Sequence, residues 1–285
     1  MLLYRWSSLL RAYDLRLGYN RVIVLLSALG AAVALVAGIV AGLPLPDVLL
    51  RAFAGGMTAF AAAALAKELD PDHPGSAVVG AALAVPLVWW VARVDSLLPL
   101  LWLILSLRFV NRSTGLPPRL TDALGLILLA GWLSWARTPL FGVLTGVVLL
   151  LDVLLPGGRR VHGWLGAPVA LAAGVYWGVN TDRYPSAAPE PWLVVCLLAL
   201  TIAVIGVILT CYVILAPGDA TGRPLDGSRV QAGQIVALTV GLFFASWHGR
   251  DGATLFAALW AALAGTVVLY WRDVDSRRAV FPSPS

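Results

Sequence analysis

Charge is scarce in this sequence, and lysine is almost absent. Asp, Glu, Lys and Arg make up 12% of the 285 residues, and Lys67 is the one lysine. Hydrophobic residues make up 60%, and the mean hydropathy is +0.86. A soluble domain needs polar faces that alternate with its apolar core, and no such alternation runs along this chain. The composition therefore excludes a soluble globular protein and indicates a multi-pass membrane protein.

Cysteine and histidine are also rare, which limits metal and redox chemistry. Cys196 and Cys211 are the two cysteines, and on one helix they would lie about 22 Å apart, too far for a disulfide bond. The histidines, His73, His162 and His248, all fall near the predicted ends of membrane spans. No Cys/His spacing matches a zinc, haem or iron–sulfur site. We therefore predict no cofactor from these residues.

The first 21 residues do not have the pattern of a cleaved signal peptide. They contain several arginines, and no small-residue cleavage site follows the first apolar run. Large apolar side chains recur on one side at helical spacing: Trp6, Leu9, Leu10, Tyr13 and Leu17. This pattern predicts a short amphipathic helix over residues 1–21 that lies on the cytoplasmic surface of the membrane.

Apolar runs of membrane-spanning length fill most of the remaining chain, and turn-forming residues separate them. We predict an all-α integral membrane protein with about ten transmembrane helices. They form a single domain over residues 22–272, followed by a short cytoplasmic tail over 273–285. The predicted spans are 22–43, 48–66, 75–92, 96–110, 119–136, 139–155, 163–180, 191–216, 230–247 and 253–271.

Basic residues are distributed unequally between the two sides of these spans. With the N-terminus on the cytoplasmic side, the opposite side holds Arg51, Arg93, Arg137, Arg183 and Arg250, and all other basic residues fall on the cytoplasmic side. This asymmetry predicts that both termini are cytoplasmic. It also explains the pI of about 9.6 without nucleic-acid binding. The preference for arginine over lysine is typical of a GC-rich bacterial genome, so we expect a bacterial plasma (inner) membrane protein whose partners are membrane lipids.

Small residues recur every four positions in three of the spans. Such stripes let membrane helices approach closely. They predict packing within the chain, or contact with a second copy or another membrane subunit. In the first and seventh spans, the glycines of these stripes are Gly30, Gly38, Gly42, Gly166, Gly174 and Gly178. Segments 30–42 and 166–178 are also alike in sequence, and with two further similarities they predict a parallel repeat of spans 1–4 and 7–10.

Ionisable residues are absent from the middle of every predicted span. Asp152 comes closest, about one turn inside the cytoplasmic end of the sixth span, where Arg159 or Arg160 is its expected partner. Without a buried acid or histidine relay, the sequence argues against a proton pump or a proton-coupled carrier. Among uncharged polar residues, Gln231 and Gln234 share one helix face and are candidates to line a polar cavity or to bridge helices.

Acidic and basic residues gather instead in the cytoplasmic connections, most densely in AKELDPDHPGSAVV at residues 66–79. The Asp-Pro and His-Pro steps of this stretch are typical of a solvated turn. The alternative is a binding site, since carboxylates suit Mg²⁺ and arginines suit phosphate oxygens. The candidate residues of such a site are Glu68, Asp70, Asp72, His73, Arg108, Arg112, Asp152, Asp219 and Asp226, with Asp70 and Asp72 as the metal ligands if Mg²⁺ is used.

The acidic loops also resemble those of the UbiA prenyltransferase superfamily. The similarity rests on the loop after the second span, with Glu68, Asp70 and Asp72, and on the later loop with Asp219 and Asp226. It implies a site for Mg²⁺ and a diphosphate that the two loops would form together. The sequence departs from that family in three ways: the first-loop acids follow one another at intervals of two, the second loop also has a different spacing, and the predicted helix count is one too many.

Three functions are compatible with these features. The first is a small-molecule or lipid transporter, because the chain resembles drug/metabolite-type carriers in size and span count. The second is a membrane-embedded, Mg²⁺-dependent transferase that acts on polyprenyl or lipid phosphates at the cytoplasmic face. The third is a non-catalytic subunit or scaffold of a membrane complex. We place the transporter first, because membrane topology explains most of the charged residues.

Overall fold

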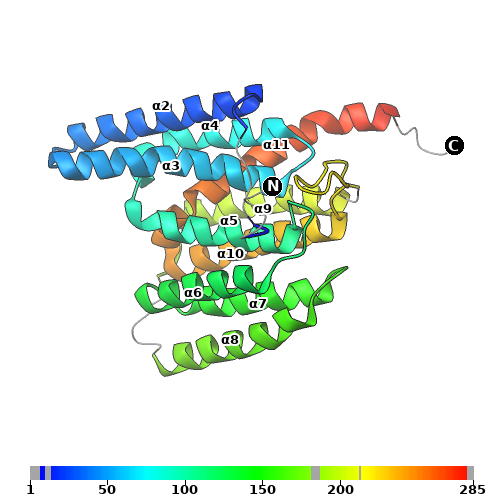
Figure 1. Cartoon of the computed structure of the whole chain (residues 1–285). Helices are drawn as coiled ribbons and strands as arrows, with labels where there is room; N and C mark the ends of the chain where they lie inside the picture. The colour runs from blue at the N-terminus through cyan, green and yellow to red at the C-terminus, as the bar shows by residue number, and fades with distance from the viewer. Residues whose placement is uncertain (1–6, 10–13, 181–186, 212, 281–285) are drawn as a thin grey trace. The chain divides into compact units, whose positions relative to one another are not determined.

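The structure is a computed structural model that describes residues 7–9, 14–180, 187–211 and 213–280 (Figure 1). Helices account for 79% of the residues, and no strand occurs in the described part of the chain. The predicted all-α class is therefore confirmed. The described ranges contain ten α-helices and one short 3₁₀ helix, η1, at Val94–Ser96.

The helices follow the predicted apolar runs closely. Most ends agree within a few residues, because turn-forming Pro and Gly residues end these helices where the sequence indicates. The clearest differences lie at the ends of the eighth, ninth and tenth runs, whose helices end at Thr210, Leu255 and Val280 instead of residues 216, 247 and 271. The helices are α2 (Gly18–Val40), α3 (Leu45–Leu69), α4 (Pro74–Val91), α5 (Leu97–Asn111), α6 (Leu120–Ala136), α7 (Leu140–Leu154), α8 (Arg160–Val179), α9 (Pro191–Thr210), α10 (Gly227–Leu255) and α11 (Ala257–Val280).

Helix α10 contains the predicted break in the segment HGRDG. Gly249 has φ 55° and ψ −132°, a combination that is essentially restricted to glycine. The carbonyl oxygens of Ala187 and Ala188 lie 3.0 Å from where its Cβ would be, so a side chain has no room there. The chain therefore kinks at Gly249 although the helical pattern continues to Leu255.

Among the described residues, six helical segments are long and apolar enough to cross a membrane by length and composition. They include α9, which has the highest mean hydropathy, 3.0, and the combined segment Val94–Asn111. Three further apolar helices are shorter: Leu120–Ala136, Leu140–Leu154 and Ala257–Arg272. The structure thus supports a membrane protein with several spanning helices.

The chain divides into two compact units, which we call unit 1 and unit 2. Unit 2 comprises residues 14–94, 195–210 and 257–285, and its helices α2, α3 and α4 run alongside one another (Figure 1). Small residues allow these close approaches. The carbonyl oxygen of Gly55 lies 3.1 Å from where a Cβ of Gly30 would be. The backbone nitrogen of Gly80 lies 2.7 Å from where a Cβ of Gly265 would be. These glycines therefore serve packing inside unit 2.

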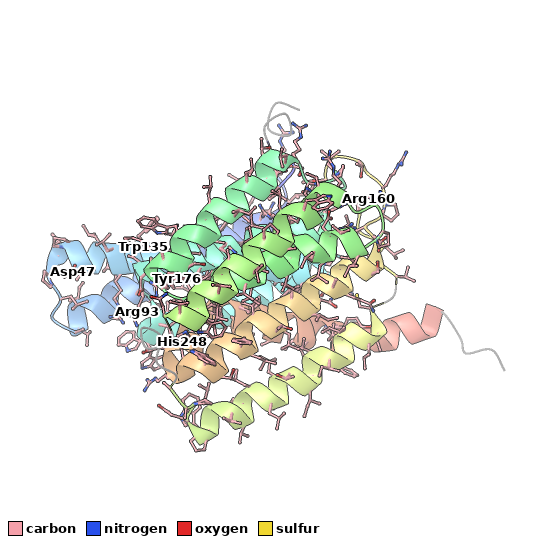
Figure 2. All side chains as sticks on the ribbon, turned by 90° about the horizontal axis from the view of Figure 1, so that it is seen from below. Asp47, Arg93, Trp135, Arg160, Tyr176 and His248 are labelled. Atoms are coloured by element: carbon pink, nitrogen blue, oxygen red, sulfur yellow. The ribbon has the colours of Figure 1, made fainter. Side chains whose placement is uncertain are left out.

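Unit 1 comprises residues 1–13, 95–194 and 211–256, and contains α5, α6, α7, α8 and α10. Helix α7 packs closely on α8, because Gly146 and Gly166 leave room for the facing backbone. Figure 2 shows Arg160 at one end of α8 and Tyr176 near the other, with Trp135 and His248 near that second end. Unit 1 therefore has a basic end, at Arg160, and an aromatic end.

The described part of the N-terminal segment differs from the predicted amphipathic helix. Ser8 and Leu9 lie in bends, and a turn precedes α2. Trp6, Leu10 and Tyr13, which carry most of the predicted apolar face, lie outside the described residues. At the other end of the chain, α11 continues to Val280, so part of the predicted tail is helical.

The other sequence-based packing hypotheses have mixed outcomes. Gly38 packs against Val48, whereas Gly174 and Gly178 have nothing within 4 Å of their Cβ positions and Gly42 lies in a turn with φ 69°. An oligomer contact through Gly174 and Gly178 stays a prediction. Helices α2–α4 belong to unit 2 and α5 to unit 1, whereas the matching set α8–α11 is divided differently. This division does not favour the predicted repeat.

Candidate functional site

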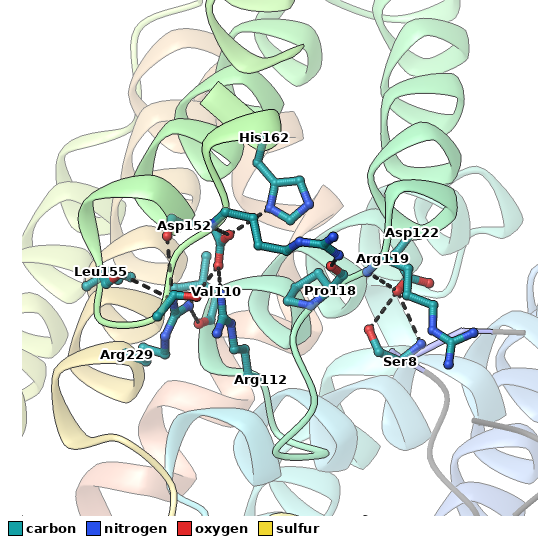
Figure 3. Close-up of polar contacts among 12 residues, drawn as sticks. Ser8, Val110, Arg112, Pro118, Arg119, Asp122, Asp152, Leu155, His162 and Arg229 are labelled. Carbon is teal, nitrogen blue, oxygen red and sulfur yellow. Dashed lines mark hydrogen bonds and ion pairs between the residues drawn. The ribbon is translucent and has the colours of Figure 1, made fainter. Parts of the chain in front are cut away.

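Asp152 is the centre of a buried ionic cluster in unit 1 (Figure 3). It lies in the last turn of α7, and its side chain has no solvent exposure. Its Oδ1 accepts hydrogen bonds from Arg112 and Arg229, each at 2.9 Å. Its Oδ2 accepts from the Nδ1 of His162 at 2.7 Å and from the backbone N–H of Arg159 at 3.3 Å. This carboxylate is therefore satisfied on both oxygens.

The turn between α7 and α8 brings His162 to Asp152. Gly157 adopts φ 70° and reverses the chain, which favours glycine because this φ strains other residues. Arg159 then caps α8, and its N–H points at the carboxylate, as expected at a helix N-terminus that attracts negative charge. His162 follows in the first turn of α8 and is fully buried, with its ring 4.9 Å from that of Phe109.

Arg229 joins the ends of three helices around Asp152. It lies in the first turn of α10 and is 2% exposed. Besides Asp152, its guanidinium donates to the carbonyl oxygen of Val110 at 2.9 Å and to that of Pro156 at 2.7 and 3.0 Å. The last carbonyl groups of a helix have no partner within the helix. Arg229 therefore satisfies the ends of α5 and α7 while it neutralises Asp152.

Arg112 approaches the same carboxylate from the C-terminal end of α5. It has φ 52° and is the one non-glycine residue with a positive φ in the described part of the chain. This left-handed conformation costs a non-glycine residue roughly 1–2 kcal/mol. It directs the guanidinium to Asp152 and to the carbonyl oxygen of Gly157 at 2.8 Å. Arg112 is also the most exposed member of the cluster, with 13% of its side chain accessible.

The hydrogen bonds determine how this cluster can react. Because both arginines are permanently charged, Asp152 is the acceptor and the Nδ1 of His162 carries the proton. The Nε2 of His162 then presents a lone pair, and this buried atom has no hydrogen-bond partner among the described residues. With the imidazole neutral, the two guanidinium groups and the one carboxylate leave one surplus positive charge. The cluster thus combines a proton acceptor with groups that suit an anion.

A second acidic site lies at the same end of unit 1 and holds the N-terminal segment (Figure 3). Asp122 is 6% exposed, and its carboxylate accepts from the hydroxyl groups of Ser7 and Ser8, each at 2.6 Å. It also accepts from the backbone N–H of Arg119 at 2.9 Å and so caps α6. Arg108, a predicted site residue, donates to the carbonyl oxygen of Leu9 at 3.2 Å. Asp122 and Arg108 therefore fasten residues 7–9 to unit 1.

The acidic stretch at residues 66–79 belongs to unit 2 and forms the turn between α3 and α4. Asp70 ends α3, and its Oδ1 lies 2.7 Å from the Nδ1 of His73, the residue before α4. Glu68 is 1% exposed and Asp70 5% exposed, whereas Asp72 is half-buried. The stretch is thus a tightly bonded turn, and two of its acids are buried instead of solvated.

The other predicted residues lie near the basic end of unit 1 but outside the cluster. Asp219 is exposed in a loop whose backbone bonds to residues 113–114. Asp226 caps α10 by accepting from the backbone N–H groups of Ser228 and Arg229. Partial burial raises the pKa of Asp226, but the bonds from Ser228 and Arg229 outweigh it and lower this pKa below its usual value. Gln234 is buried and Gln231 half-buried in α10.

The structure brings together only part of the predicted site. Arg112 and Asp152 meet, but His162 and Arg229 were missed, and Asp152 meets its expected partner Arg159 through the backbone instead of the guanidinium. Arg159 contributes its backbone N–H, while its guanidinium bonds to the carbonyl oxygen of Pro118. No group of at least three His, Cys, Asp or Glu side chains within the described residues could hold a metal ion. The one feature of the sequence that pointed to the contact between Asp152 and His162 was the place of the histidine, just after the turn that follows Asp152.

Comparison with known proteins gives no relative: no protein-family model, no curated protein and no solved structure matches the chain. Function must therefore be argued from the site itself.

Proposed function

We propose that this protein is a multi-pass membrane carrier for a small molecule or a lipid, with the Asp152 cluster as the charged part of its pathway. The observation that carries the proposal is the burial together of Asp152, His162, Arg112 and Arg229 at the ends of apolar helices. Buried ionisable groups are expensive in a membrane protein, and they mark substrate and ion pathways.

The orientation of the carrier follows from the basic end of unit 1. Arg108, Arg112, Arg159 and Arg229 gather there through the contacts described above. Because cytoplasmic connections carry an excess of basic residues, we place this end and both termini on the cytoplasmic side of a bacterial plasma membrane. The shorter apolar helices, together with α8, would complete ten spans, since a helix of about 17 residues reaches across the hydrocarbon core.

Burial of the cluster supports the carrier over a scaffold. Breaking a buried ion pair costs roughly 3–5 kcal/mol, and replacing the whole cluster by apolar residues is often neutral or stabilising. Packing alone therefore gives no reason to keep four ionisable groups in unit 1. A charged substrate or a coupling ion gives such a reason.

Transport by the reconstituted full-length chain tests the proposal. Two assays cover the two substrate classes: dithionite quenching of fluorescent phosphatidylglycerol in vesicles, and currents on solid-supported membranes after concentration jumps of inorganic phosphate. We expect transport above protein-free vesicles in one assay, and its loss in Arg112→Gln. Arg137→Gln removes the same charge at the other end of unit 1 and should leave transport intact. Folded protein that gives no signal in either assay contradicts the proposal.

The Asp152–His162 pair also favours a second candidate, a transferase that acts on polyprenyl or lipid phosphates. A carboxylate that holds a histidine through Nδ1 leaves Nε2 available as a general base. Asp70 and Asp72, the metal ligands that the sequence suggested, belong to unit 2, so this candidate uses the unit 1 cluster without them. A polyprenyl diphosphate should then raise the melting temperature of wild type but not of Arg112→Gln. Equal melting temperatures with and without the diphosphate exclude this candidate.

A further inference from the structure

Two buried nitrogen atoms of the Asp152 cluster have no hydrogen-bond partner among the described residues: His162 Nε2 and Arg112 Nε. Buried polar atoms in native structures nearly always have partners, so each such atom calls for an explanation. His162 Nε2 is an acceptor in the tautomer that Asp152 imposes, while Arg112 Nε is a donor. The cluster therefore has unused capacity both for a proton and for an anion.

The two arginines of the cluster are not equivalent. Both donate to Asp152 Oδ1, so two like charges share one oxygen. Arg229 is 3% exposed at its side chain and is held by further carbonyl groups, whereas Arg112 is 13% exposed. Arg112 also stands on a strained left-handed backbone. Arg112 is therefore the cation that can leave Asp152 at least cost.

We propose that this cluster binds a tetrahedral oxyanion, a phosphate-type group that is either free or part of a lipid headgroup, together with one proton. The proton adds to the lone pair of His162 Nε2, and the imidazolium keeps its Nδ1–H bond to Asp152. Asp152 is then balanced by Arg229 and by the imidazolium. Arg112 is released from Oδ1 and presents its forked N–H donors to the anion.

Charge balance makes the two binding events cooperative. While Arg112 stays bound to Asp152, a proton on His162 would raise the surplus positive charge of the buried cluster from one to two, which is costly. An anion on Arg112 removes that surplus and so favours the proton. By linkage, the proton increases the affinity for the anion by the same factor. Binding of the oxyanion should therefore strengthen as the pH falls.

The groups that face His162 are consistent with this exchange. Asp152 comes from α7, Arg112 from the end of α5, Arg159 from the start of α8, and Arg229 from the start of α10, where Asp226 forms the N-cap. The ring of Phe109 covers one side of the imidazole. Within the part of the chain that the structure describes, Asp152 is the one carboxylate bonded to His162, so a change in its cation partners acts directly on this histidine.

Calorimetric titration of the full-length chain with sulfate, in an uncharged detergent, tests the inference. Sulfate mimics phosphate but stays a dianion between pH 5.5 and 7.5. We expect about tenfold tighter binding at the lower pH. Two buffers with different ionisation enthalpies should report uptake of about one proton per sulfate at pH 7.5.

Four variants locate the effect. His162→Asn keeps a donor near the position of Nδ1 but has no titratable nitrogen, so it should lose both the pH dependence and the proton uptake. Arg112→Gln should bind sulfate at least tenfold more weakly, and Arg112→Lys should restore part of the affinity. Arg137→Gln, at the opposite end of unit 1, should bind sulfate as the wild type does.

The source of the oxyanion follows from the same titration in nanodiscs. If phosphatidic acid in a phosphatidylcholine disc weakens sulfate binding, the group belongs to a lipid; if sulfate affinity is unchanged, the ligand is a free ion. Absence of sulfate binding in detergent overturns the site, and binding without proton uptake overturns the coupling. The role of this binding in transport rests on the proposed carrier function, but the binding itself does not. Proton-coupled binding without transport would contradict the carrier function and leave the binding site intact.

Discussion

The Nδ1 of His162 lies 2.7 Å from Oδ2 of Asp152, and neither side chain is exposed to solvent. These residues are ten positions apart, and the turn at residues 155–158 folds one helix end back onto the next. The sequence indicated no buried acid or histidine relay within the predicted spans, whereas Asp152 and His162 form a buried acid–histidine pair where α7 ends and α8 begins. This pair supplies a group that could couple transport to protons. The absence of charge from the middle of the spans had argued against such coupling.

Asp152→Asn should strongly destabilise the protein. The substitution keeps the shape of the side chain but leaves Arg112 and Arg229 buried without a negative partner, which costs about 3–5 kcal/mol. Asp95→Asn is the matched control, because Asp95 is 42% exposed and pairs with Arg137 at 3.0 Å. An exposed pair contributes only about 0–1 kcal/mol. Thermal unfolding in detergent should show a large loss for Asp152→Asn alone, and equal losses would contradict the central role of Asp152.

Replacement of Arg112 should separate its ionic role from its backbone strain. Arg112→Asn and Arg112→Gln both remove the guanidinium, but asparagine adopts the left-handed conformation at φ 52° more readily. We therefore expect Arg112→Asn to be more stable than Arg112→Gln by about 1 kcal/mol. The melting temperatures of the two variants, measured side by side, decide this; the reverse order would show that the conformation of Arg112 is not strained.

Glycine at position 146 should be required for the contact between α7 and α8. A Cβ there would lie 2.7 Å from both the carbonyl oxygen of Gly166 and the backbone nitrogen of Ala170. Gly146→Ala should therefore destabilise the protein by roughly 1–3 kcal/mol through overpacking. Gly174→Ala on α8 is the control, since nothing lies within 4 Å of that Cβ position, and it should stabilise the helix by up to about 1 kcal/mol. Equal stabilities of Gly146→Ala and Gly174→Ala against unfolding would contradict the close packing of α7 on α8.

Stability at low pH should depend on Asp226. Partial burial raises its pKa, but the bonds from Ser228 and Arg229 dominate, so the folded-state pKa lies below the usual 3.8. A lowered pKa in the folded state contributes stability above the pKa of the unfolded chain, and this contribution is lost as the pH falls through the folded-state value. Asp226→Asn should therefore show a weaker loss of stability than wild type when unfolding is followed from pH 6 down to pH 3. Parallel curves would mean that this cap does not titrate on unfolding.

The candidate site was predictable only in part. Arg112 and Asp152 stood out because charge is rare in this chain, and an acid just inside an apolar run is conspicuous. His162 and Arg229 were overlooked because each lies at a span end, where histidine and arginine are ordinary. Their roles arise from contacts over distances of 10 and 77 positions in the sequence. Apart from the place of His162 just after the turn that follows Asp152, nothing in local spacing indicates such contacts.

The acidic stretch at residues 66–79 shows the opposite error. Its density of carboxylates suggested either a solvated turn or a metal site, yet Glu68 and Asp70 are buried and Asp70 bonds to His73. Sequence pattern identified the turn, because Pro71 and Pro74 interrupt the helices. The burial of its acids depends on helices α2, α3, α4 and α11 of unit 2, which pack around one another.

The sequence by itself determined the class of this protein and its elements. Apolar runs that end at Pro, Gly and charged residues define helices such as α6 and α7, because length, hydrophobicity and turn chemistry are local properties. Tertiary structure alone decided which helices pack together and which charges meet. Asp152, His162, Arg112 and Arg229 come from four helices or helix ends, and a buried charge takes as partners the groups that folding brings within hydrogen-bond distance.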